Sequence, residues 1–175
     1  MMRKINRTVA FFSLLFLSAS ALRAQTEDVI LMQLSQSAQQ PSVLNGVELQ
    51  QNGTKNEAYI LQATNAGSGG VKAVQAGSDN TIELMQSGDY IDIEISQHGN
   101  GNLYEADIEG EGSRIDVSQS GYENFIFQSL ISNHSDIAIR QNGNQNEVIH
   151  TGTATNSGIQ VRQQGSGMKV IIQTN

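Results

Sequence analysis

The stretch SRIDVSQSGYEN, residues 113–124, contains the pattern that decides the fold. From Ser113 to Gln119, a serine, an isoleucine, a valine and a glutamine alternate with an arginine, an aspartate and a serine. A period of two is typical of a β-strand with one buried face. Gly121 and Asn124 follow in a short connection, where glycine allows a positive backbone φ. The stretch therefore predicts a strand, a tight arc and the beginning of a second strand.

The same spacing recurs on both sides of this stretch, along most of the chain. Successive motif glutamines are 24, 22, 22, 22 and 22 residues apart. Such a fixed period is typical of a chain that folds as stacked similar units. The six copies are Gln51-x-Gly53-x-x-Asn56, Gln75-x-Gly77-x-x-Asn80, Gln97-x-Gly99-x-x-Asn102, Gln119-x-Gly121-x-x-Asn124, Gln141-x-Gly143-x-x-Asn146 and an altered last copy, Gln163-x-Gly165-x-x-Met168.

A second alternating arm follows each motif asparagine. In the second copy, for example, Asn80, Ile82, Leu84 and Gln86 share one face. Two strands per unit cannot bury an apolar face alone, but units stacked about 4.8 Å apart would pair like strands in parallel and enclose a core. The pattern of residues 45–175 therefore predicts an all-β fold. The predicted fold is an amyloid-like β-solenoid of about six stacked 22-residue strand-arc-strand coils, with two parallel sheets.

Equivalent amide side chains would lie directly above one another in this stack. Such amides can hydrogen-bond along a ladder, whereas an isolated buried amide is costly. The second-arm glutamine is replaced by Ile108, Leu130 and Gly152 in the third to fifth copies, which predicts apolar packing at 108 and 130. The predicted ladder and assembly residues are Gln51, Asn56, Gln62, Gln75, Asn80, Gln86, Gln97, Asn102, Gln119, Asn124, Gln141, Asn146 and Gln163. The predicted arc glycines are Gly53, Gly77, Gly99, Gly121, Gly143 and Gly165.

Residues 1–24 lie outside the repeat and have the features of a secretory signal peptide. Arg3, Lys4 and Arg7 precede an apolar run at 9–17, and small residues lead to a cleavage position after Ala24. A membrane anchor is the competing interpretation, but the run is too short to span a bilayer and the chain has no cysteine for lipidation. We therefore expect a secreted protein.

Charge and composition disfavour several classes of protein. Without residues 1–24 the chain has six basic and 17 acidic residues, which gives a net charge of −11. Nucleic acid is therefore not expected as a partner. The chain has no cysteine, so no disulfide framework is expected, and its 5% aromatic content does not suit a conventional globular core. We expect repeated hydrogen bonds and repeated packing to stabilise the fold instead.

The spacing Gln-x-Gly-x-x-Asn-x-x-x-x-x-Gln, in tandem 22-residue copies on an exported chain, resembles the curlin repeat family of bacterial curli subunits. The fullest matches are 51–62 and 75–86, and the resemblance extends over about 45–174. It implies a subunit of an extracellular functional amyloid fibre, a curli pilus (fimbrium) that supports cell adhesion and the biofilm matrix. The implied partners are further copies of the chain, other curlin subunits, and an outer-membrane secretion pore with its accessory proteins. Residues 25–44 correspond to the family's secretion-targeting segment.

Curlin subunits include a major, fibre-forming type and a minor type that is retained at the cell surface and nucleates the fibre. The last copy, with Met168 in place of asparagine, resembles the irregular last repeat of the minor type. The major type remains the alternative, because the terminal units of solenoids are commonly atypical.

Two other classes of function are compatible with a repeated β-fold. A carbohydrate-acting protein on a parallel β-helix would need convergent carboxylates or a base beside a cleft, whereas the acidic residues here fall on scattered outward positions. We therefore expect no enzymatic activity, no catalytic residues, no cofactor and no small-molecule substrate. A monomeric secreted β-solenoid adhesin remains open, while the mixed outward residues disfavour an ice-binding surface.

The sequence predicts no metal site. His98, His134 and His150 lack a short ligand spacing and are expected at the surface. The acidic stretch 107–112 matches neither the EF-hand nor the nonapeptide calcium pattern, so a solvated arc is the better interpretation.

Both ends of the predicted solenoid keep the strand pattern, at 46–49 and at 170–172, and the single proline, Pro41, lies outside the first coil. Residues 29–32 can add a partial strand. Unblocked edges accept further strands, so growth by edge-to-edge stacking of coils is expected. Outward carboxylates would repel one another along the stack, and we therefore expect acidification to speed assembly.

Overall fold

The computed structural model describes residues 29–35, 46–64 and 68–175. The expected signal peptide at 1–24 lies outside these ranges, as does the expected secretion-targeting segment at 25–44 except for its residues 29–35. The two extra residues of the first period fall between 63 and 70, and this segment is only partly described.

Strands follow one another throughout the described residues, which contain no helix. Each fully described repeat gives two strands, of nine residues each except in the last repeat, where β13 has six. The strands are β1 (Val29–Ser35), β2 (Gly46–Thr54), β3 (Glu57–Thr64), β4 (Gly70–Ser78), β5 (Thr81–Asp89), β6 (Asp92–Asn100), β7 (Leu103–Glu111), β8 (Arg114–Tyr122), β9 (Phe125–Asn133), β10 (Asp136–Asn144), β11 (Glu147–Thr155), β12 (Gly158–Ser166) and β13 (Lys169–Thr174).

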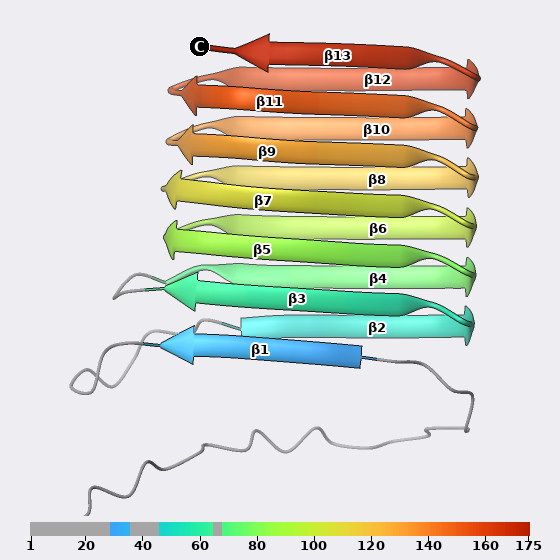
Figure 1. Cartoon of the computed structure of the whole chain (residues 1–175), viewed down its shortest axis with the longest axis horizontal. Coiled ribbons are helices and arrows are strands. Elements are labelled where there is room, and N and C mark those ends of the chain that lie inside the picture. The colour runs from blue at the N-terminus through green and yellow to red at the C-terminus, as the bar shows by residue number, and fades with distance from the viewer. Residues whose placement is uncertain (1–28, 36–45, 65–67) are drawn as a thin grey trace, which may run out of the picture.

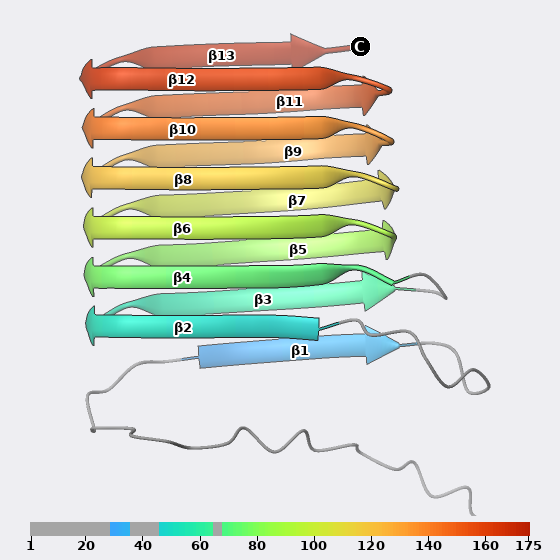
Figure 2. The same cartoon turned by 180° about the vertical axis from the view of Figure 1, so that it is seen from behind.

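The strands form two parallel sheets that face each other (Figure 1). The odd-numbered strands make a seven-stranded sheet in the order β1-β3-β5-β7-β9-β11-β13, and the even-numbered strands make a six-stranded sheet from β2 to β12. Figure 2 shows the same stack from behind, with the even-numbered sheet in front. Each even strand and the odd strand after it form one coil, so the predicted β-solenoid of about six coils is confirmed. β1 adds half a coil before them and confirms the partial strand predicted at 29–32.

Pairing is in register, so each motif residue lies beside its equivalent in the neighbouring coil. Gln97 of β6, for example, pairs with Gln75 of β4 and with Gln119 of β8. A shift of one residue would turn the inward Ile93 and Ile95 outward and bury charged residues, which fixes the register.

The core is the layer between the two sheets. In β6, inward residues are buried and alternate with outward residues that are exposed or half-buried. The same alternation holds from β4 to β10, and only the strands at the ends of the stack are more exposed. The largest apolar contributions come from isoleucines, because a β-branched side chain packs well on a pleated surface.

The strands are longer than the sequence pattern indicates, because pairing continues through the arcs. β6 ends at Asn100 and β7 begins at Leu103, so only two residues separate them. Arc backbone groups bond to neighbouring coils: the Gly101 N–H donates to the carbonyl of Ser78 at 3.0 Å, and the Leu103 N–H to that of Asn124 at 2.9 Å. Since every coil has the same path, even its corners have partners in the next coil.

Candidate assembly surface: amide ladders and open edges

The motif glutamines form one hydrogen-bonded ladder beside the first arc of each coil, the arc that follows an even-numbered strand. Each side-chain Nε2 donates to the Oε1 of the glutamine in the next coil, and from Gln51 to Gln163 the distances are 2.7, 2.9, 2.9, 3.1 and 2.8 Å. The same Nε2 also donates to backbone carbonyls, as from Gln97 to Asn102 at 3.2 Å and to Thr81 at 2.9 Å. Every donor along this ladder therefore points toward the C-terminal end of the stack.

The motif asparagines form a second ladder that runs in the opposite direction. The Nδ2 of Asn80 donates to the Oδ1 of Asn56 at 3.0 Å, and the bond repeats at 2.9, 2.9 and 3.0 Å up to Asn146. Each Nδ2 also donates to the carbonyl of the arc glycine one coil ahead, as from Asn80 to Gly99 at 2.9 Å. These asparagines are buried and fully bonded, which accounts for an amide inside the core.

The ladder predicted on the second arm is short. Gln62 donates to Gln86 at 3.4 Å, and Gln86 in turn donates to the carbonyl of Ile91 at 3.1 Å. The column continues with Ile108 and Leu130, which are buried in apolar contact as predicted. The Oε1 of Gln62 has no partner among the described residues.

All six predicted arc glycines have positive φ, and five of them set how closely the coils stack. At Gly99, φ is +111°, and a Cβ added there would lie 2.0 Å from the carbonyl oxygen of Gly121. Only a residue without a side chain allows this approach. Gly165, in the last coil, differs: a Cβ there would meet only the Cε of Met168, at 3.5 Å.

The second arcs contain glycines of the same kind that the motif search missed. Gly88, Gly110 and Gly152 have φ values of +119°, +139° and +114°, and a Cβ at each would lie within 2.1 Å of a carbonyl oxygen in the next coil. The spacing Gln86-x-Gly88 repeats the first-arc pattern and could have indicated the first of them.

One expectation about the histidines is wrong. His98 and His134 are exposed, as expected, but His150 is 0% exposed and lies in the core on β11. It shares the inward phase of Asn146 and Val148, so the alternation that places those residues inside also places His150 inside. Burial lowers the pKa of His150, because it penalises the charged imidazole.

His150 belongs to a small group of buried polar side chains that motif reasoning missed. The Tyr104 hydroxyl donates to the Oε1 of Gln128 at 2.9 Å, and burial raises the pKa of Tyr104 well above its usual value. Gln128 lies beside His150 in the pairing of β9 with β11. The Nε2 of Gln128 and both ring nitrogens of His150 have no hydrogen-bond partner among the described residues.

At the C-terminal end of the stack the two ladders end differently. The Nε2 of Gln163 donates to the carbonyls of Glu147 and Met168 at 3.1 and 2.9 Å, but no described glutamine continues the ladder past Gln163. Met168 donates its backbone N–H to the Oδ1 of Asn146 at 3.1 Å, as a motif asparagine would, but it has no amide to extend the asparagine ladder. At the other end, the Oε1 of Gln51 accepts no hydrogen bond from a described residue.

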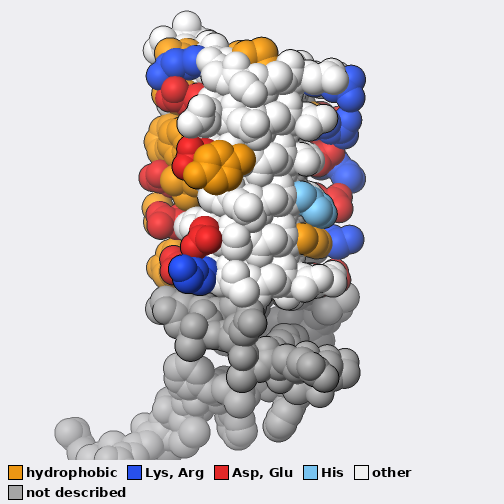
Figure 3. Space-filling model, turned by 90° about the vertical axis from the view of Figure 1, so that its right-hand side faces the viewer, with side chains coloured by type: hydrophobic (Ala, Val, Ile, Leu, Met, Phe, Trp, Pro, Cys, Tyr) orange, Lys and Arg blue, Asp and Glu red, His pale blue; other side chains and the backbone are white. Residues whose placement is uncertain are grey.

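The outward faces of the described strands carry charged side chains. Figure 3 shows the edge formed by the first arcs, where uncharged polar side chains and backbone dominate and the charged side chains lie toward the flanks. Among the described residues, no cluster of His, Asp or Glu has the geometry to hold a metal ion.

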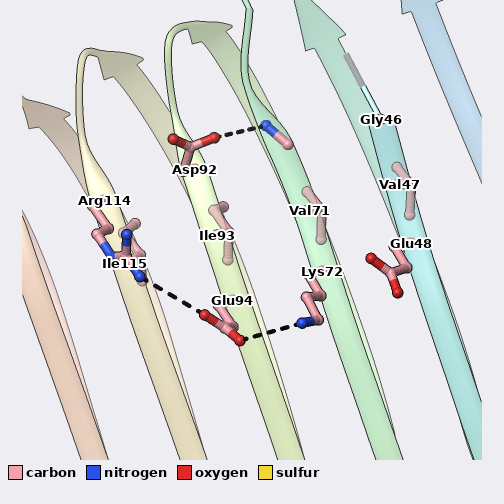
Figure 4. Close-up of a pocket in the computed structure, with 11 residues that line it drawn as sticks. Gly46, Val47, Glu48, Val71, Lys72, Asp92, Ile93, Glu94, Arg114 and Ile115 are labelled. Carbon is pink, nitrogen blue, oxygen red and sulfur yellow. Dashed lines mark hydrogen bonds and ion pairs between the residues drawn. The ribbon is translucent and has the colours of Figure 1, made fainter. Parts of the chain in front are cut away.

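A groove of about 400 Å³ lies where β2, β4, β6 and β8 begin (Figure 4). Three of its charged residues form ion pairs, since Glu94 lies 3.8 Å from both Lys72 and Arg114, and Asp92 accepts the backbone N–H of Gly70 at 3.1 Å. These pairings join neighbouring strands of the sheet, so they support the stack.

Comparison with protein-family models, curated proteins and solved structures found no match for this chain. Nothing in the described ranges is a helix of the length and apolarity that crossing a membrane requires.

Proposed function

We propose that the protein is a structural subunit of an extracellular fibre of the curli type, which grows or is nucleated by end-to-end stacking of β-solenoid coils. The fibre supports adhesion and the biofilm matrix at the cell surface. The subunit leaves the cell through an outer-membrane pore with accessory proteins, and its partners are further copies and related subunits. The repeat motif, the signal-peptide features and the charge of the chain support this proposal.

The complementarity of the two ends carries the proposal. The Nε2 of Gln163, the last glutamine of the ladder, lacks the contact to a glutamine Oε1 that the other ladder glutamines make, and the Oε1 of Gln51, the first, accepts no hydrogen bond from a described residue. A second copy whose β1 is displaced, so that its β3 pairs with β13, would offer its Gln51 to Gln163 and its β2 to β12. The open position at Gly165 fits the carbonyl of a further arc, as the other five arc glycines do within the chain.

A thioflavin T time course of purified residues 25–175, with electron microscopy of the product, tests the proposal. The same material is used as a seed for a second curlin-type subunit. Fibres or seeding support the proposal, whereas a soluble β-rich monomer that neither assembles nor seeds would favour a monomeric adhesin.

The same experiment separates the two subunit types. Rapid seeding with poor growth alone identifies a surface nucleator, which the altered last repeat at Met168 favours. Long fibres from the chain alone identify the major, fibre-forming type.

A further inference from the structure

The column Ala106, Gln128, His150 and Ile172 crosses the core on β7, β9, β11 and β13. His150 therefore lies one strand from the C-terminal edge of the odd-numbered sheet. It is fully buried, and neither ring nitrogen has a partner among the described residues. The Oε1 of its neighbour Gln128 accepts the Tyr104 hydroxyl at 2.9 Å.

No charged group faces His150 from the strands around it. Its neighbours on the same face are Gln128 on β9 and Ile172 on β13, and the inward residues of the opposite strands β10 and β12 are Ile137, Ile139, Ile159, Val161 and the ladder glutamines. The charged residues of these five strands are outward-facing: Asp136 and Arg140 on β10, Glu147 on β11, Arg162 on β12 and Lys169 on β13. Glu147 and Lys169 pair with each other at 2.8 Å. A proton on His150 would therefore have no counter-charge, and neither ring nitrogen has a hydrogen-bond partner among the described residues.

We propose that protonation of His150 in mild acid opens the C-terminal end of the solenoid. When its imidazole is protonated, β11 and β13 separate from the stack, and the edge formed by β12 and β13 is lost. The edge is thus complete at neutral pH and opens in mild acid. The opening follows from the buried cluster alone; its effect on fibre growth rests on the proposed function.

Proton linkage determines in which direction pH shifts the equilibrium between the closed and the opened end. The opened state, with an ordinary histidine pKa of about 6.5, binds more protons than the closed state, in which burial lowers the pKa. The closed state is therefore fully favoured above about pH 6.5 and loses up to about tenfold in population per pH unit below it, until the lowered pKa is reached.

Hydrogen exchange of freshly prepared, unassembled residues 25–175 at pH 7.5 and 5.0, corrected for intrinsic exchange rates, tests this. We expect protection in β11–β13 to fall more than protection in β5–β7, with a difference of up to about tenfold for each pH unit below 6.5. His150→Leu should abolish this difference, and the control His98→Leu, at an exposed histidine, should retain it. His150→Gln removes the titration but keeps a polar group beside Gln128, and it serves if the leucine variant does not fold.

An equal acid response of β11–β13 in the wild type and in a folded His150 variant would overturn the proposal, as would no selective response in the wild type. Elongation of preformed seeds, followed at both pH values, tests the proposed fibre function separately from the opening of β11–β13. If acid opens β11–β13 selectively but no seed grows at either pH, the acid-induced opening is supported and the proposed fibre function is wrong.

Discussion

At the scale of single residues, the close approach of the arcs makes glycine indispensable. Gly99→Ala would place a methyl group 2.0 Å from the Gly121 carbonyl, at a φ of +111°. We expect a loss of more than about 3 kcal/mol in the free energy of unfolding, measured by denaturant titration. Gly158→Ala is the matched control, because nothing lies within 4 Å of its added Cβ. Equal stability of the two variants would contradict a stack spaced by its glycines.

The amide ladders give a second prediction at this scale. Gln97→Ala combined with Asn102→Ala removes a rung from each ladder and leaves the amides of neighbouring coils unpaired. We expect a loss of about 3–5 kcal/mol in stability and slow or absent assembly by thioflavin T. Gln160→Ala, at an exposed position of β12, should change either property little. Unchanged assembly of the double variant would argue against the ladder as a structural element.

The burial of Tyr104 predicts that the stability of the fold decreases at alkaline pH. The folded pKa of Tyr104 is raised by burial, so the unfolded state loses the proton first as pH rises above about 10. Stability from this group is therefore complete below pH 10 and falls above it. Denaturation midpoints measured between pH 8 and 11 should fall in the wild type and fall less in Tyr104→Phe. A phenylalanine variant with the same pH slope would show that another group causes the decline.

At the scale of elements, the arms of the repeat were predictable and their corners were not. Alternation fixed which residues of β6 or β8 face inward, because a strand has a period of two. Pairing through the arcs depends on contacts between coils, which no single repeat reveals. The lack of a short ligand spacing wrongly favours a surface position for His150, whereas its phase within β11 places it in the core. The lack of partners for its ring nitrogens depends on three-dimensional contacts that the sequence does not contain.

The turn between β12 and β13 is the element that interrupts the asparagine ladder. Met168→Asn would keep the backbone bond to Asn146 and add a side-chain donor at its Oδ1, as in the internal coils. We expect about 1 kcal/mol of added stability from this bond within the chain. The Oδ1 of the introduced asparagine would also accept the Nδ2 of Asn56 in a second copy, and a bond of similar strength there would lower the monomer concentration in equilibrium with fibres about fivefold. Met168→Leu is the control without an amide. A critical concentration unchanged by asparagine would mean that this turn does not contribute to the joint between copies.

At the scale of the whole molecule, two kinds of titrating group act on assembly in opposite directions. His150 should open the C-terminal end as pH falls below about 6.5, whereas protonation of the outward carboxylates in stronger acid should remove their mutual repulsion. Thioflavin T lag times should therefore lengthen from pH 7.5 to about 5.5 and shorten again near pH 4. His150→Leu should show only the shortening. A wild type whose assembly speeds up steadily on acidification would contradict the slower phase.

The in-register stacking of the coils has a consequence for how such a chain can change over generations. Each coil contacts only the coils before and after it, and Asp92 and Arg114 occupy the same place in successive coils. Loss or duplication of the 22 residues 92–113 would therefore leave every backbone junction with an equivalent neighbour, although loss would also remove Tyr104, the partner of Gln128. Unequal recombination between repeats would shorten or lengthen the molecule by one layer of about 4.8 Å without disturbing either end. The gene is thus free to vary the length of the protein, while selection acts on the two terminal coils.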